Sequence, residues 1–264
     1  AESTLMKGMR WMSENNGEDK KQSSLQRYLY AADKERLRTL LEEMSQIAAA
    51  SIETAVGALR SGDAVLAEKV IDGDDLIDEK EEQIDQECLY SIAMRQPMRE
   101  DLRFVYSVMK IIVDLERIGD QSVNIAMNVR DLPEGITFPE EMIPFVEKMA
   151  EENIKMIGEV MQAFAGEDET VICTARERRK LIKETRSNAV SMLDKIIASE
   201  KACENDRMRL FCTVILTLRH LSRISDHVLN LAERVSFIAT GISPLTLKRA
   251  QEKSQPKTLF DKEG

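Results

Sequence analysis

The sequence predicts an all-α protein, a tandem pair of three-helix bundles with six long antiparallel helices. Residues 115–129 recur 106 positions later as residues 221–235 with seven of fifteen identities, which indicates one helical unit used twice. Apolar residues recur at spacings of three and four, the period of an amphipathic helix. Only 11 glycines, 6 prolines and few aromatic residues occur among 264 residues, which is typical of a helical protein.

The first repeat is predicted to span residues 25–131. Its three periodic segments cover residues 25–60, 63–94 and 99–130, and Gly62 and Pro97 separate them. Residues 1–24, which precede them, are polar and lack a sustained period, so they are predicted to form an amino-terminal tail.

The second repeat is predicted to span residues 138–242. Its segments cover residues 140–165, 168–202 and 206–240, and Gly166, Asn205 and Gly241 mark their ends. Short connections make neighbouring helices antiparallel, so each repeat forms a three-helix bundle. Residues 243–264 are rich in Lys and Gln and are predicted to form a carboxy-terminal tail.

The third helix of each repeat carries the clearest apolar seam, at helical spacing. In the first repeat the seam consists of Phe104, Val108, Ile111, Leu115, Ile118, Ile125 and Val129. In the second repeat it consists of Leu210, Val214, Thr217, Leu221, Ile224, Val228, Leu231 and Val235. These residues are the predicted core.

Composition excludes several classes of function. The formal net charge of −10 argues against binding of nucleic acid, which needs a basic surface. No apolar run approaches the length of a membrane span, so no membrane insertion is expected. The four cysteines lack C-x-x-C spacing and are predicted to be reduced in a cytoplasmic protein. Nucleotide-binding and catalytic motifs are missing, so the chain is not expected to be an enzyme.

Two pairs of acids stand out against this background. Asp74 and Asp78 are four residues apart on the second helix, whose seam Glu81 completes, and Glu116 and Asp120 are four apart on the third. Residues four apart lie on one helix face. If the two helices pack together, four carboxylates meet, and a multivalent cation would offset their repulsion. All-oxygen ligands suit hard or borderline ions.

Alternatives to a metal site remain open. The acids of residues 72–87 could simply form a solvated helix face. Glu116 could form a buried salt bridge with Arg103 or Arg117. A carboxylate-metal hydrolase would use the same four acids. His220 and His227 lie on one helix face without an E-x-x-H motif, so a di-iron enzyme is not expected, and each histidine is predicted to be hydrogen-bonded.

Three stretches resemble the PhoU family of phosphate-transport regulators. They are DDLIDEKEEQID at 74–85, RQPMREDLRFVYSVMKIIVDLERIGDQSVNIA at 95–126 and LSRISDHVLNLAERVSFIATG at 221–241. The resemblance covers about residues 28–242. It implies tandem three-helix bundles that can hold multinuclear metal clusters on paired acidic motifs. By match of motif, Asp74, Asp78, Glu116 and Asp120 are the ligands, and the resemblance implies iron first, with Mn, Mg or Zn as alternatives.

The resemblance also implies a function and partners. A member of this family would be a cytoplasmic adaptor between the ATPase subunit of a phosphate ABC transporter and a sensor histidine kinase. It would hold the phosphate-starvation response off when phosphate is sufficient, and it would form a homodimer. A PhoU-like soluble domain of a sodium–phosphate cotransporter is the alternative, although the QPMREDLR segment at 96–103 favours the regulator.

The second repeat departs from the acidic pattern. Arg179, Lys183 and Arg186 replace Asp74, Asp78 and Glu81, and Ser222 replaces Glu116, whereas Asp226 corresponds to Asp120. An ion pair between Asp226 and Arg179 or Lys183 would close this region without metal. We therefore expect one metal site, in the first repeat only. The basic group is either a charge-paired face or a site for phosphate or an acidic partner.

Overall fold

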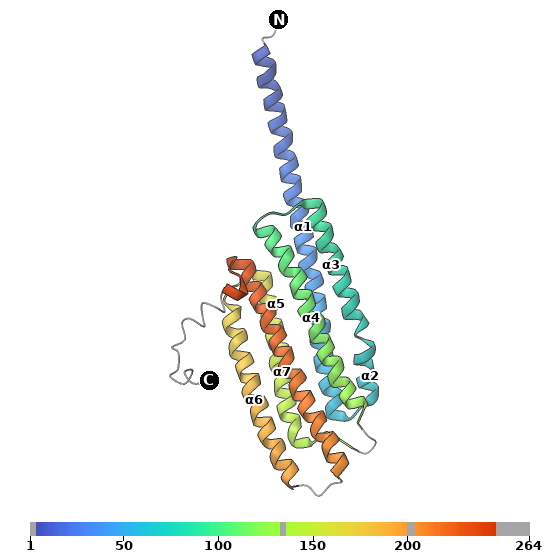
Figure 1. Cartoon of the computed structure of the whole chain (residues 1–264). Coiled ribbons are helices and arrows are strands. Elements are labelled where there is room, and N and C mark those ends of the chain that lie inside the picture. The colour runs from blue at the N-terminus through green and yellow to red at the C-terminus, as the bar shows by residue number, and fades with distance from the viewer. Residues whose placement is uncertain (1–3, 133–135, 200–203, 247–264) are drawn as a thin grey trace, which may run out of the picture.

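The structure is a computed structural model that describes residues 4–132, 136–199 and 204–246. Within these residues there are no strands. The helices are α1 (Thr4–Ser61), α2 (Ala64–Asp72), α3 (Asp75–Arg95), α4 (Glu100–Arg130), the short 3₁₀ helix η1 (Glu140–Met142), α5 (Ile143–Gly166), α6 (Val171–Ser199) and α7 (Glu204–Thr240). The all-α tandem architecture is confirmed: α1, α2–α3 and α4 form one bundle, and α5, α6 and α7 form the other (Figure 1).

One predicted boundary is wrong. The first helix begins at Thr4 and not at Leu25, so most of the predicted amino-terminal tail is helical and projects beyond the other helices (Figure 1). This segment contains no proline, and Met, Glu and Lys, which favour helix, are frequent in it. The predicted carboxy-terminal tail lies outside the described residues from residue 247 onward.

The second predicted helix is also interrupted. It divides into α2 and α3 at Gly73 and Asp74, where the Asp74 N–H donates to the Ile71 carbonyl over 3.3 Å, a three-residue turn. Glycine and aspartate are poor interior helix residues, and aspartate favours the position before a helix begins. Asp74 occupies that position in α3. The break therefore places one predicted ligand at a helix start.

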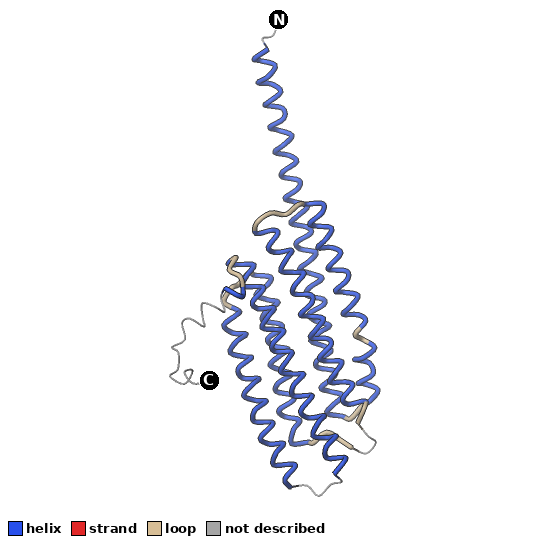
Figure 2. Tube along the Cα trace, viewed as in Figure 1, coloured by secondary structure: helices blue, strands red, loops and turns tan. Residues whose placement is uncertain are grey.

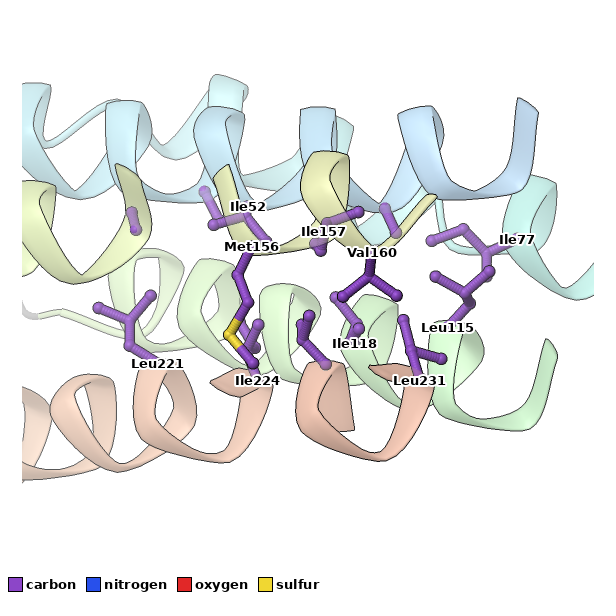
Figure 3. Packing of buried hydrophobic residues seen from close by; sticks show 14 of the residues in the cluster. Ile52, Ile77, Leu115, Ile118, Met156, Ile157, Val160, Leu221, Ile224 and Leu231 are labelled. Atoms are coloured by element: carbon purple, nitrogen blue, oxygen red, sulfur yellow. The ribbon is translucent and has the colours of Figure 1, made fainter. Parts of the chain in front are cut away.

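One continuous core joins the two bundles. The trace in Figure 2 is helical almost throughout, with short loops between neighbours. Side chains of α1 and α5 face those of α4 and α7, as Ile52, Met156, Ile118 and Leu231 illustrate (Figure 3). The predicted seam of α4 is entirely buried, and that of α7 is buried from Val214 to Val235. A buried hydrogen bond from Asn153 Nδ2 to the Leu221 carbonyl, 2.9 Å, ties α5 to α7.

The contact between α4 and α7 is nearly symmetric. Asp114 Oδ1 on α4 lies 2.9 Å from His227 Nδ1 on α7, and Gln121 Oε1 on α4 lies 2.9 Å from His220 Nδ1. Asp114 and His220 are equivalent positions of the duplication, as are Gln121 and His227. Asp114 thus contacts the counterpart of Gln121, and Gln121 contacts the counterpart of Asp114. This reciprocal pattern is that of a two-fold dimer interface. The prediction that both histidines are hydrogen-bonded is confirmed.

The remaining sequence predictions concern thiols and membranes. Cys88 is buried, Cys173 and Cys212 are exposed, and all three are free thiols, while Cys203 lies outside the described residues. None of the helices in the described part of the chain combines the length and apolar character that crossing a membrane requires.

Candidate metal centre

The close approach of α3 and α4 depends on Gly119. A Cβ atom at this position would lie 2.6 Å from Ile77 Cδ1 and 3.4 Å from Asp74 Oδ1. Ile77 and Gly119 are both buried. The missing side chain therefore lets the first turn of α3 lie directly against the middle of α4, and it brings the carboxylate of Asp74 beside that helix.

The four predicted carboxylates influence one another electrostatically across this contact. Burial raises the pKa of Asp74, and the charges of Asp78, Asp120 and Asp75 raise it further. Burial also raises the pKa of Glu116, and the charge of Asp120 raises it further, while the charge of Arg117 lowers it. The two helix faces thus place acids close enough to oppose each other's ionisation.

Glu81 belongs to the same cluster. Burial raises its pKa, and so do the charges of Asp78, Asp85 and Asp120. The predicted ligand set did not include this residue. The signal was present, because Glu81 follows Asp78 by three residues, which is one turn of the same helix face.

Arg117 is the cation of the cluster. Its Nη1 lies 2.8 Å from Asp120 Oδ2, and its Nε lies 3.3 Å from Glu116 Oε2. Of the two bridges considered for Glu116, the one with Arg117 is therefore formed. Arg103 instead donates from Nε to the Ile238 carbonyl over 3.1 Å. Lys80, the single base of the acidic segment, pairs with Glu43 of α1 over 2.6 Å.

The chemistry of these donors suits a hard cation, but their side chains are not yet arranged around one point. All donors are carboxylate oxygens, the ligands preferred by hard cations, and one Arg leaves the cluster with excess negative charge. In the described part of the chain, however, no three Asp, Glu, His or Cys side chains already surround a point that could take a metal ion. Arg117 holds two of the acids, and its side chain is 55% exposed.

The equivalent contact between α6 and α7 carries an ion pair instead. Arg179 Nε lies 2.5 Å from Asp226 Oδ1. The predicted pairing of Asp226 with a base of α6 is confirmed, with Arg179 as the partner. Where the first repeat brings two acids together, the second brings an acid and a base together.

Comparisons with known proteins agree with the duplication. The PhoU domain family matches residues 41–129 and again 146–235. The phosphate-specific transport system accessory protein PhoU homolog of Rhizobium meliloti is 31% identical over 221 residues, which cover 82% of this chain and 91% of that protein. The Escherichia coli accessory protein PhoU is 28% identical over 216 residues, 80% of this chain and 86% of that protein.

A solved structure gives the same result. The crystal structure of PhoU from Pseudomonas aeruginosa superposes with a TM-score of 0.72 at 30% identity, covering 81% of this chain and 100% of that chain. The family match alone extends over more than half of the sequence and falls on both helical repeats. This chain belongs to the PhoU family.

Proposed function

We propose that this protein is an accessory and regulatory protein of phosphate transport. The observation that carries the proposal is the match of both repeats to the PhoU domain, together with relatives named phosphate-specific transport system accessory proteins. The match spans 91% of the Rhizobium relative, so the likeness extends over nearly all of that accessory protein. The names of these relatives mention no cotransporter.

The proposed role is that of a cytoplasmic adaptor. In this role the protein joins the ATPase subunit of a phosphate ABC transporter to a sensor histidine kinase, and it represses the starvation response when phosphate is sufficient. It acts as a homodimer and without catalysis. A rigid bundle with a single continuous core supports such a role, because its outer helix faces remain available to partner helices.

The proposed regulator carries one metal site, between α3 and α4. Asp74, Asp78, Glu116 and Asp120 would hold the metal, with Glu81 as a fifth donor. Iron is the first candidate, and Mn, Mg or Zn are the others. The metal would supply positive charge to the acidic cluster, and the carboxylates would fix α3 against α4. The raised pKa values of Asp74, Glu81 and Glu116 support this proposal, because they reflect negative charge without sufficient compensation.

A complementation experiment tests both levels of the proposal. The gene is deleted in its native host and replaced by the wild type, by Asp74→Ala/Glu116→Ala or by the control Asp72→Ala/Glu79→Ala. The control removes two exposed acids of the same segment. A phosphate-starvation reporter is measured in high phosphate, and the metal content of each purified protein is determined.

We expect the deletion to derepress the reporter, and the wild type and control to restore repression. The Asp74→Ala/Glu116→Ala protein should lose most of its bound metal. A reporter that ignores the deletion would refute the regulatory role. Equal metal content in all three proteins would refute the site and leave the regulatory role standing.

A further inference from the structure

The contact between α6 and α7 is the structural counterpart of the acidic cluster. In the duplication, Arg179 and Asp226 correspond to Asp74 and Asp120, and both pairs face each other across their two helices. The two antiparallel contacts therefore share one register. Further along the same contact, Lys183 takes the position of Asp78, and Arg223 takes the position of Arg117.

Positive charge at this contact is only partly compensated. Arg117 pairs with Glu116 and Asp120, but its counterpart Arg223 has Ser222 at the position of Glu116, and Arg179 already binds Asp226. Among the described residues, no ion pair joins Lys183, Arg186 or Arg223 to a carboxylate. The charges of Arg223 and Arg219 also contribute, after burial, to the lowered pKa of the neighbouring His220.

Two acids near this contact are already engaged. Glu184 lies on the adjoining side of α6 and faces Lys180, with 3.8 Å between Lys180 Nζ and Glu184 Oε1. Asp226 is bound by Arg179. The region from Arg176 to Met192 contains six bases and two acids, whereas the chain as a whole has a net charge of −10. This part of α6 therefore carries positive charge on a protein that is acidic as a whole.

The surface here is hollowed and lined by hydrogen-bond donors. An open groove of about 490 Å³ is lined by Lys183, Arg186, Ser187, Val190 and Ser191. Two of these side chains are cations and two are hydroxyls, and no carboxylate is among them. Charged donors and hydroxyls are the groups that bind phosphate oxygens, and Arg can bind two of those oxygens at once.

We propose that this groove binds a small phosphate-class oxyanion, such as inorganic phosphate or pyrophosphate. An acidic polypeptide is the less suitable occupant, because the lining donors come from two turns of a single helix and offer no extended surface. The site is separate from the proposed metal centre and does not depend on it.

Calorimetric titration of the full chain with inorganic phosphate and with pyrophosphate, at constant ionic strength, tests the proposal. The variant Lys183→Gln/Arg186→Gln is compared with the control Lys69→Gln/Lys148→Gln, which removes two exposed lysines on α2 and α5. We expect saturable binding by the wild type. The groove variant should bind about tenfold to hundredfold more weakly, since each charged hydrogen bond contributes strongly. The control should change affinity less than about twofold, because distant exposed charges are screened by salt.

Circular dichroism of each variant excludes misfolding, and the single variant Lys183→Gln, which alters one exposed side chain, provides a milder test. Equal affinity in the groove variant and the control would overturn the proposal, as would a lack of saturable binding by the wild type to both anions. A polyglutamate peptide that binds through Lys183 and Arg186 and that pyrophosphate fails to displace would also overturn it, and would identify a protein-partner site instead.

Discussion

At the scale of single residues, the first repeat concentrates acids that oppose each other's ionisation. Asp74 is the clearest case, because each cause acting on it raises its pKa: burial first, then Asp78, Asp120 and Asp75. A carboxyl group whose pKa is higher in the folded state stabilises the fold only while it is protonated. That contribution is lost as the pH rises through the folded-state pKa.

Neutralising Asp74 should therefore stabilise the metal-free protein at neutral pH. We expect Asp74→Asn, measured in EDTA at pH 7, to raise the melting temperature by about 2 to 4 °C, which corresponds to roughly 1 kcal/mol for a domain of this size. The gain should shrink as the pH falls toward 4, where the wild-type carboxyl also becomes protonated.

Thermal melts followed by circular dichroism at both pH values measure this effect. The matched control is Asp72→Asn, which neutralises an exposed acid two residues away. If Asp72→Asn stabilises the protein as much as Asp74→Asn does, the effect comes from net charge, and the interpretation of the cluster is wrong.

At the scale of the helices, close packing of α3 on α4 controls the acidic site. The helical backbone at position 119 does not itself require glycine. Inside a helix, glycine is about 1 kcal/mol less favourable than alanine. It is required by space, because Ile77 Cδ1 would lie 2.6 Å from an added Cβ. An added methyl group would force the buried Ile77 side chain to turn or the two helices to separate.

Replacing one glycine of α4 and one glycine of α5 by alanine separates the effect of helix propensity from the effect of packing. Gly158→Ala in α5 meets no atom within 4 Å and should stabilise the protein by about 1 kcal/mol. Gly119→Ala should be less stable than Gly158→Ala by about 1 to 3 kcal/mol, the cost of overpacking a core. Urea denaturation of both variants measures the difference. Equal gains would mean that α3 and α4 tolerate a wider separation.

At the scale of the whole molecule, the two repeats join through the pseudo-symmetric α4–α7 contact. Burial lowers the pKa of His220, and the charges of Arg223 and Arg219 lower it further. A histidine with a depressed pKa contributes stability above its ordinary pKa of about 6.5. This contribution is lost as the pH falls toward the folded-state pKa, because the unfolded chain binds the proton more readily.

Between pH 7 and pH 5 the stability of the wild type should therefore fall relative to that of His220→Gln. Glutamine keeps a hydrogen-bonding group near Gln121 but cannot take up a proton. Unfolding free energies from urea titrations at pH 7, 6 and 5 measure the two slopes, and His227→Gln separates the contribution of the other histidine. Identical slopes for the wild type and His220→Gln would contradict the assignment.

The sequence predicted some features of the helices better than others. The seam of α4 was predictable residue by residue, since burial follows the helical period over many turns. The break at Gly73 and Asp74 was not predicted, because one turn of weak helix formers perturbs the period too little to be noticed. The start of α1 was also missed, since residues before Leu25 form helix without an apolar seam.

The sequence by itself determined the duplication, the two helical bundles and the reversal of charge between them, because these depend on residue types and spacing along one chain. Only the tertiary structure decided how side chains from different helices pair. It assigned Arg117 to Glu116 and Asp120, Arg179 to Asp226, and Arg103 to a backbone carbonyl of α7. Such choices depend on the register between packed helices, and no period within one helix contains that register.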